Sequence, residues 1–382
     1  MELYVHLPFC ARKCRYCDFA SYAGRADAIP SYVDAVLAEA RAEAEALGHP
    51  GMETVFLGGG TPSLLPPEQL RRLLTGLRSL FPFAADAEIT SEANPGTLTG
   101  SWLEAALACG VNRLSLGMQA YQPRLLRLLG RIHSYDQVCQ SVEAARAAGV
   151  CNLSLDLMFG LPGQTAADWA ETLDAALALA PQHLSCYGLI PEEGTPLKAD
   201  LDAGRCYLPD EDVERAMYDA ALDTLSAHDF RQYEISNFAR PGYACRHNLG
   251  YWRQVPYLGL GAAASSMLPF ATPNVAYIRR TNPADLDDYL DMAREAAWHA
   301  RTSENISPAE AQFETMMLGL RTTMGVSEEA FLRMHGISLA ARYGQQLAHL
   351  AEEGLVTHVD SWWRLTRRGM DVQNAVLVTL MD

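Results

Sequence analysis

The first three-fifths of the chain, up to residue 228, repeats one pattern six times: an apolar run that suits a strand, then a segment with helical periodicity. The runs that suit strands are 3–7, 54–57, 88–92, 113–116, 152–158 and 183–189. The segments that suit helices are 31–47, 67–80, 102–108, 135–148, 166–179 and 210–228. Strands that alternate with helices predict parallel pairing and right-handed crossovers. We therefore expect a βα barrel or an open doubly wound sheet, and this pattern alone does not choose between them.

Residues that begin and end helices lie where this pattern needs them. Pro67 opens the second helical segment, and Thr165 with Asp168 resembles a capping box. Gly110 and Gly149 follow helical segments, where glycine commonly ends a helix. In parallel α/β folds the reactive groups gather at the carboxyl ends of the strands. The loops after the predicted strands are therefore the places where we expect a functional site.

Three cysteines follow the first predicted strand, Cys10, Cys14 and Cys17. Three basic residues stand between them: Arg12, Lys13 and Arg15. Thiolates are the form that binds metals, and neighbouring cations lower thiol pKa values, so we expect this loop to be primed for metal binding. Thiolates at these spacings can hold three corners of a 4Fe-4S cluster, which leaves the fourth iron open to another ligand.

Other interpretations of the three cysteines are open at this point. Their spacing of i, i+4 and i+7 also places them on one face of a helix, where they could simply be buried. A zinc ion could recruit His6 as a fourth ligand. A disulfide would suit a secreted protein.

Composition and charge restrict the function classes. The chain has 382 residues, 49% hydrophobic and 20% charged, which suits a globular protein with a sizeable core. Its formal net charge of −16 argues against a nucleic-acid partner. Nine cysteines, an odd number spread over a long chain, do not suggest a disulfide framework. Six of them have no neighbour at ligand spacing and are expected to be dispensable for metal binding: Cys109, Cys139, Cys151, Cys186, Cys206 and Cys245.

The sequence predicts a cytoplasmic location. Met1, Glu2 and Leu3 do not begin a signal peptide, because no basic segment and no long apolar segment follows. The longest uncharged run, 254–278, could span a bilayer by length, but its prolines and glycines suit buried strand and loop. We therefore expect free thiols in a reducing compartment and at most peripheral contact with a membrane.

Polar or flexible residues follow several predicted strands. The turn Gly58, Gly59 and Gly60 follows the second strand, and its backbone could approach a ligand or present N–H groups to an anion. Glu92 ends the third strand and Asn94 follows it, Gln119 follows the fourth, and Asp156 lies on the fifth. Singly, each could be satisfied inside the protein, and the turn could be only a tight connection. Together they suggest one shared polar ligand.

These features together resemble the radical SAM superfamily, in which S-adenosylmethionine chelates the open iron of the cluster. Four segments resemble its coproporphyrinogen III dehydrogenase branch: 4–10, 56–62, 155–165 and 190–196. The resemblance covers nearly the whole chain. It implies a partial six-stranded βα barrel with a small C-terminal helical domain. It also implies an S-adenosylmethionine site lined by Tyr4, Tyr16, Gly59, Gly60, Thr61, Glu92, Gln119, Arg131 and Asp156.

Arg131 suits that role on chemical grounds as well, because a guanidinium can bind a carboxylate with two hydrogen bonds. The alternative is a solvated surface arginine.

Two departures from the dehydrogenase pattern argue against decarboxylation. The dehydrogenases carry a fourth cysteine after the third, where this chain has Asp18 and then Phe19. They also carry an N-terminal extension, whereas this sequence begins at the first strand.

A third feature resembles the signature of the HemW-type haem chaperones within this branch. His247, Asn248, Tyr251 and Trp252 form the motif His-Asn-x-x-Tyr-Trp. Histidine and tyrosine can both ligate haem iron, and tryptophan offers a broad face to a macrocycle. The alternative is an ordinary packed histidine beside aromatic residues.

The chain changes character from about Asn282. Helices are predicted at 309–321, 328–334 and 339–353, followed by a hairpin at 355–365 and a last helix. This order resembles a winged helix, although the acidic charge disfavours DNA binding. We expect three parts: a radical SAM partial barrel at 1–240, the motif and a closing strand at 241–281, and a helical domain at 282–382.

The sequence therefore predicts a haem carrier that binds a 4Fe-4S cluster, S-adenosylmethionine and haem. The alternative is an enzyme, an oxygen-independent coproporphyrinogen III dehydrogenase. The resemblance implies haem-accepting respiratory proteins as partners. A bacterioferritin-like haem donor and a homodimer are further candidates.

Overall fold

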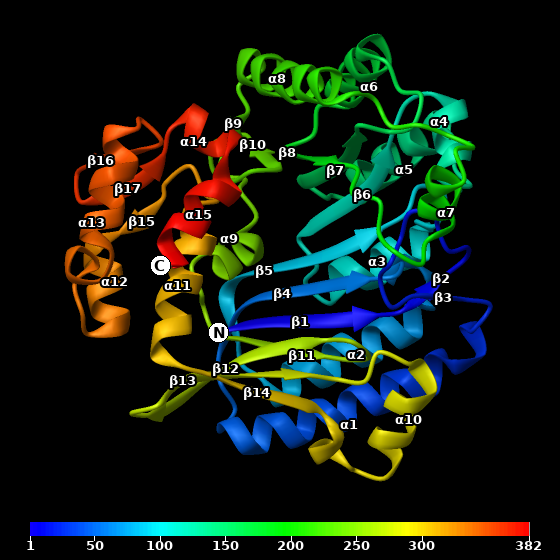
Figure 1. Cartoon of the computed structure of the whole chain (residues 1–382). Coiled ribbons are helices and arrows are strands. Elements are labelled where there is room, and N and C mark those ends of the chain that lie inside the picture. The colour runs from blue at the N-terminus through cyan, green and yellow to red at the C-terminus, as the bar shows by residue number, and fades with distance from the viewer. Residues whose placement is uncertain (382) are drawn as a thin grey trace.

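A computed structural model describes residues 1–381 of the chain. Its centre is a twelve-stranded sheet in the order β14-β13-β12-β11-β1-β4-β5-β6-β7-β8-β10-β9. The six predicted strands are its parallel middle: β1 Glu2–Leu7, β4 Met52–Gly59, β5 Phe83–Ala93, β6 Arg113–Gln119, β7 Asn152–Phe159 and β8 His183–Gly188. The two edges of the sheet do not pair with each other, so the expected partial barrel is confirmed (Figure 1).

The predicted helices also form, and they cover the outer face of the curved sheet (Figure 1). They are α1 Ile29–Leu47, α2 Pro67–Leu80, α3 Gly100–Ala108, α5 Tyr135–Ala147, α6 Ala166–Ala178 and α8 Glu211–Ala227. Thr165 and Asp168 form a reciprocal capping box at the start of α6, as their spacing predicts. Gly110 and Gly149 follow helices with φ of 91° and 104°, a conformation that favours glycine.

Shorter elements fill the connections. Helices α4 Pro123–Leu128 and α7 Pro196–Asp202, the short strands β2 Phe9–Cys10 and β3 Tyr22–Ala23, and the 3₁₀ turns η1 Ala26–Ala28 and η2 Pro62–Leu64 lie between the main elements. At one edge, β10 Asn237–Ala239 pairs antiparallel with β8, and β9 Arg231–Gln232 pairs with β10.

The other edge contains strands that the sequence pattern did not resolve. Helix α9 Arg246–Trp252 leads into β11 Tyr257–Leu260, which pairs parallel with β1. Strands β12 Ser265–Thr272, β13 Val275–Thr281 and β14 Thr302–Ile306 then add in antiparallel order. The run 254–278 therefore forms strands and turns, as expected. Within residues 1–381, no helix combines the length and apolar character needed to cross a bilayer.

The segment after residue 282 is not helical throughout. Helix α10 Leu286–Arg294 packs its buried side chains into the barrel core, and η3 Trp298–Ala300 leads to β14 in the large sheet. A separate core follows, formed by α11 Pro308–Gly319, α12 Glu328–His335, α13 Leu339–Glu352, α14 Arg367–Asp371 and α15 Gln373–Met381 with a small sheet of β15 Val326–Ser327, β17 Trp362–Leu365 and β16 Val356–Val359. The winged-helix-like order is thus present. The division of the chain at residues 240 and 281 stays a prediction.

A buried carboxylate joins α1 to this added edge. Glu39 is fully buried, and it accepts hydrogen bonds from the backbone N–H of Gly261 at 2.9 Å and the hydroxyl of Tyr289 at 2.7 Å. The amide of Asn282 donates a third bond at 2.7 Å. Burial raises the pKa of Glu39, which these donors oppose. One side chain therefore connects α1, the turn after β11 and α10.

We predict that Glu39→Ala destabilises the protein strongly. Its removal leaves several buried donors without an acceptor, a cost of about 3 kcal/mol. Asp34→Ala on the same helix is the control, because Asp34 forms an exposed ion pair with Arg72 and should contribute little. Denaturant unfolding of both variants measures the difference. Equal stability of the two variants would contradict the structural role of Glu39.

Candidate functional site

One cavity at the carboxyl ends of the parallel strands collects most of the predicted site residues. It has a volume of about 330 Å³. Ten of the predicted residues line it: Cys10, Cys14, Tyr16, Cys17, Gly59, Gly60, Glu92, Gln119, Arg131 and Asp156. The sequence expectation that groups after successive strands would meet is therefore consistent with the geometry.

The three cysteines lie in a loop and not on a helix. Cys10 ends β2, which pairs with β3, and the backbone N–H of Cys17 donates to the carbonyl of Cys14 in a turn. All three are half-buried, and each is a free cysteine. The helix and disulfide interpretations are therefore wrong.

The zinc interpretation also lacks support from His6. Its Nε2 lies 2.8 Å from the carbonyl of Ala20 and its Nδ1 lies 3.0 Å from the Tyr4 hydroxyl, so both ring nitrogens are engaged. Within residues 1–381, no three His, Cys, Asp or Glu side chains converge closely enough for a single metal ion. A cuboidal cluster places each thiolate on a different iron, farther apart than ligands of one ion. The loop therefore fits a cluster better than zinc.

The expectation that cations lower the thiol pKa values is wrong for two of the cysteines. Burial raises the pKa of Cys10 and of Cys17. Two of the loop's three cations are engaged elsewhere: Lys13 donates to the carbonyl of Phe19, and Arg15 pairs with Asp200. The third, Arg12, lines the cavity. Thiol protons would therefore be displaced by the metal itself when it binds.

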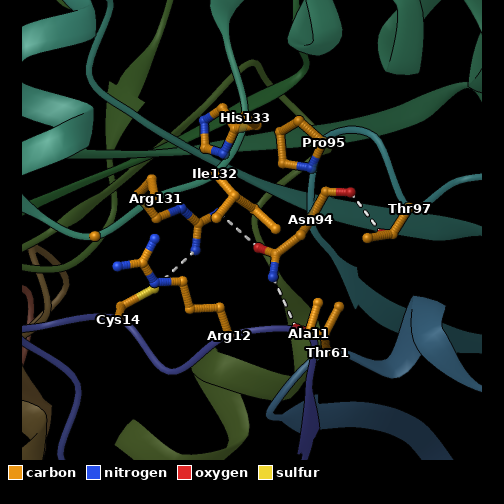
Figure 2. Close-up of a pocket in the computed structure, with 11 residues that line it drawn as sticks. Ala11, Arg12, Cys14, Thr61, Asn94, Pro95, Thr97, Arg131, Ile132 and His133 are labelled. Atoms are coloured by element: carbon orange, nitrogen blue, oxygen red, sulfur yellow. Dashed lines mark hydrogen bonds between the residues drawn. The ribbon is translucent and has the colours of Figure 1, made fainter. Parts of the chain in front are cut away.

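Two residues outside the loop hold the thiols in place. The Thr61 hydroxyl lies 3.6 Å from Cys10 Sγ, and an Arg131 N–H group lies 3.5 Å from Cys14 Sγ. Thr61 does not line the main cavity, but it lines a small neighbouring one of about 30 Å³ (Figure 2). The structure therefore places Thr61 behind the cysteine loop.

Arg131 is not the solvated surface residue that the sequence left open. Its guanidinium donates to Asn94 Oδ1 at 2.6 Å and to the carbonyl of Gly117 at 2.8 Å. Asn94 in turn donates to Thr61 Oγ1 at 2.8 Å (Figure 2). These bonds leave the guanidinium at the cavity wall, where it could bind a carboxylate. Asn94 was recognised only as a strand end, although it holds Arg131 in position.

Two half-buried carboxyl groups line the same cavity. Burial and the neighbouring Asp156 raise the pKa of Glu92 to about 7, while the backbone N–H of Gly59 donates to it at 3.1 Å. Burial also raises the pKa of Asp156, to which the Ser115 hydroxyl donates at 3.0 Å. Such a pair is costly to ionise without a partner, so it suits a ligand with a positive charge or several donors.

The glycine turn does not present free N–H groups to a ligand, which the sequence had left as one possibility. Its N–H groups are already used: Gly59 donates to Glu92, Gly60 to the carbonyl of Leu7, and Thr61 to the carbonyl of Phe9. A Cβ on Gly60 would lie 2.7 Å from the carbonyl oxygen of Phe9. The turn therefore presents no free row of donors to an anion. It needs glycine because it packs directly on β1 and the cysteine loop.

Tyr4 lies beside the cavity without lining it. Its ring stacks on Phe56, and Phe56 stacks on His247 with ring centroids 5.1 Å apart. The structure thus links the base of the predicted S-adenosylmethionine site to the His-Asn-x-x-Tyr-Trp motif, which the sequence pattern had treated as separate.

The motif forms α9 at the amino-terminal end of the strands, away from the cysteine loop. His247 is 1% exposed, and both ring nitrogens have partners, Thr54 Oγ1 at 2.7 Å and the Tyr251 hydroxyl at 3.0 Å. Burial lowers its pKa to about 3, so its ring is neutral. Glu88 accepts from the backbone N–H groups of residues 246 and 247. In this packing, haem iron could reach His247 only if α9 moved.

The rest of the motif is more accessible. Asn248 and Trp252 are half-buried, and the guanidinium of Arg321 lies 5.9 Å from the centroid of the Trp252 ring. The small residues after the motif pack against protein: a Cβ on Gly259 would meet the carbonyl oxygen of Ser265 at 2.1 Å. They therefore leave no room there for a flat ligand.

Comparisons with known proteins agree with this geometry. The radical SAM superfamily model matches residues 4–176, and the HemN C-terminal domain matches residues 306–372. The chain is 38% identical to heme chaperone HemW of Bacillus subtilis, over 98% of this chain and 97% of that protein. The chain belongs to the HemW family of the radical SAM superfamily.

Further relatives also match over nearly the whole of this chain. HemW of Escherichia coli is 32% identical over 99% of this chain and 97% of its own. A mouse relative, radical S-adenosyl methionine domain-containing protein 1, mitochondrial, is 34% identical over 99% of this chain and 87% of its own. Coproporphyrinogen III oxidase HemN of Escherichia coli has a TM-score of 0.83 at 24% identity, over 99% of this chain and 89% of that one, which supports the fold.

We predict that Cys10, Cys14 and Cys17 are each required for the cluster. Anaerobic reconstitution of the Cys14→Ala variant should give little iron and little broad visible absorption, because one corner of the cluster loses its ligand. Cys151→Ala is the control, since Cys151 is exposed and outside the cavity. A Cys14→Ala protein with full iron content, or zinc as the bound metal, would refute the assignment.

We predict that S-adenosylmethionine binds more tightly above pH 7 than below it. The pKa of Glu92 is about 7, and its ionised form is the better partner for the cationic ligand. Calorimetry between pH 6 and 8 should show affinity falling as the pH falls. Glu92→Gln should bind about tenfold more weakly at pH 8 and lose most of this pH dependence. An unchanged pH profile in that variant would exclude the role.

Proposed function

We propose that this protein is a haem carrier that also holds a 4Fe-4S cluster and S-adenosylmethionine. The observation that carries the cofactor part is the single cavity in which three free cysteines meet Glu92 and Asp156. The haem part is supported by relatives named heme chaperone, which are 32–39% identical to this chain.

The residues present suit both cofactors. Cys10, Cys14 and Cys17 would hold three irons, and the cavity beside them leaves space for a ligand on the fourth. Arg131 would bind the carboxylate of S-adenosylmethionine, while Glu92 and Asp156 would face its cationic and hydroxyl-bearing parts. When bound and reduced, the cluster supplies an electron for cleavage of S-adenosylmethionine.

The second candidate function is oxidative decarboxylation of coproporphyrinogen III. The fold likeness to HemN is the observation that favours it. Against it, Phe19 stands where the dehydrogenase pattern has its fourth cysteine, and its side chain is 63% exposed beside the cavity. We therefore propose the carrier function as the principal one.

The haem-binding role of the motif remains a prediction. It has two parts, an iron bond from His247 and a supporting role of Trp252, and only the first needs α9 to move. A bond from His247 to iron requires α9 to move, because both ring nitrogens have protein partners. Trp252 needs no such movement, since it is half-buried and its ring lies against the guanidinium of Arg321. Asn248 and Tyr251 would act by holding α9 in place.

We propose haem-accepting respiratory proteins as partners, as the relatives' naming as chaperones suggests. A bacterioferritin-like donor and a homodimer remain candidates. A cytoplasmic location is supported by the free state of all nine cysteines, which suits a reducing compartment.

We predict that the reconstituted protein binds haem and transfers it, but forms no protoporphyrinogen. The test is anaerobic incubation with coproporphyrinogen III, S-adenosylmethionine and a reductant, beside a haem titration followed by the Soret band. A HemN enzyme assayed in parallel controls for the activity of the substrate and reductant. Formation of protoporphyrinogen by this protein would contradict the carrier proposal.

A further inference from the structure

A second and larger cavity lies where the C-terminal helices meet the edge of the barrel. Its volume is about 910 Å³, within the range typical of ligand sites. Its walls come from the end of β8 and the loop after it, from α8, and from α14 with the start of α15. Figure 1 shows α14 and α15 beside the β9–β10 edge.

The cavity exists because the sheet edge is only partly covered. Strand β10 pairs with β8 along residues 183–185, and the last bond at this edge joins the N–H of Cys186 to the carbonyl of Ser236. Beyond it, Tyr187 and Gly188 face the C-terminal helices across the cavity. Ion pairs from Arg215 to Asp371 and from Arg367 to Asp219 join α8 to α14. The cavity is therefore held between two connected elements.

Tyr187 lines this cavity and also the cluster cavity. The side chain is 41% exposed. A ligand in the second cavity would therefore lie next to the predicted S-adenosylmethionine site, with the Tyr187 ring between them.

The walls suit a broad apolar ligand. Aromatic and aliphatic side chains make up much of the lining: Phe159, Tyr187, Leu189, Ile190, Tyr218, Met370 and Val372. Ile190 is 71% exposed and Val372 is 42% exposed, although both are large and apolar. Apolar side chains left in contact with water beside a cavity commonly mark a binding site.

One wall also offers a cation. Arg321 has no ion pair within residues 1–381, and its Nε lacks a hydrogen-bond partner among them. Its guanidinium is supported by the Trp252 ring. The other lining arginine, Arg215, is already neutralised by Asp219 and Asp371. Glu211 and Glu214 lie at the start of α8, and Glu214 sits against Gly188. The carboxyl group nearest in effect to Arg321 is the buried Glu234, whose pKa burial raises to about 6 and Arg321 lowers only as a minor contribution.

We propose that this cavity is the haem site, with the macrocycle against the apolar walls and a carboxylate on Arg321. This inference rests on the proposed carrier function, which supplies a flat apolar ligand with carboxylates. It also gives Trp252 a role that needs no movement of α9, because Trp252 positions the arginine that binds the carboxylate.

The test is haem titration of two variants on one helix. Ala375 lines the cavity and is exposed, so Ala375→Trp should fill the space without disturbing the core. Val378 is 61% exposed on the same helix and lies outside the cavity lining, so Val378→Trp is the matched control. Ala375→Trp should weaken haem binding by about tenfold or more, while Val378→Trp should bind as the unmodified protein does.

A second comparison does not depend on a bulky side chain. Arg321→Gln should weaken binding of haem about tenfold and leave binding of its dimethyl ester unchanged, because the ester has no carboxylate for the arginine. If Ala375→Trp binds S-adenosylmethionine with the same affinity as the unmodified protein, its fold and its first cavity are intact. Equal haem affinity in Ala375→Trp and the unmodified protein would overturn the site. If the unmodified protein itself binds no haem, the carrier function fails, and the inference fails with it.

Discussion

The parallel pairing of β1 with β4 is the contact on which the site depends. Its register places Leu7 beside Gly59, so that the glycine turn lies directly against the start of the cysteine loop. The N–H groups of Gly60 and Thr61 then donate to the carbonyls of Leu7 and Phe9. A side chain at Gly60 would collide with this backbone. The position of the first cysteine is therefore fixed by main-chain bonds between two neighbouring strands.

The electrostatics of the cavity follow from its burial. Glu92 and Asp156 are half-buried in the cavity wall. Burial raises the pKa of both carboxyl groups, and the neighbouring Asp156 raises the pKa of Glu92 further. Arg131 provides the opposite charge at the other side, and Asn94 holds it there. A ligand that carries both a positive group and a carboxylate satisfies both sides. A simple anion or a simple cation would satisfy only one, which is why S-adenosylmethionine suits this cavity.

Much of the barrel could be predicted because its strands and caps are local signals. Apolar runs such as 152–158 and caps such as Thr165 with Asp168 need no knowledge of distant residues. The antiparallel edge β12–β14 could not, because its residues alternate poorly and because Pro269 and Pro273 resemble loop residues. Helix α10 was also missed, although Asp285 caps it and Leu286, Tyr289 and Met292 form its buried face. Its contact with Glu39, some 250 residues earlier in the chain, could not be predicted from local pattern.

The sequence predicts which residues of the site lie at strand ends, but it does not predict how deeply they are buried. Groups at successive strand ends meet in any parallel barrel, so Cys10, Glu92 and Asp156 could be brought together from sequence. Burial cannot be read in this way, so the raised pKa of Cys10 was not predicted. For His247 the sequence left a packed histidine and a haem ligand as alternatives, and could not choose between them. The second cavity was also beyond the sequence, because it forms between elements from three distant parts of the chain.

Mössbauer spectroscopy of the reconstituted protein, with and without S-adenosylmethionine, tests the central claim most directly. The account predicts that three irons of the cluster keep their spectra while one changes when S-adenosylmethionine is added, because three cysteines leave a single iron open. Four irons that are unaffected by S-adenosylmethionine would mean that the protein ligates every corner. That result would contradict the account of the cysteine loop and of the cavity beside it.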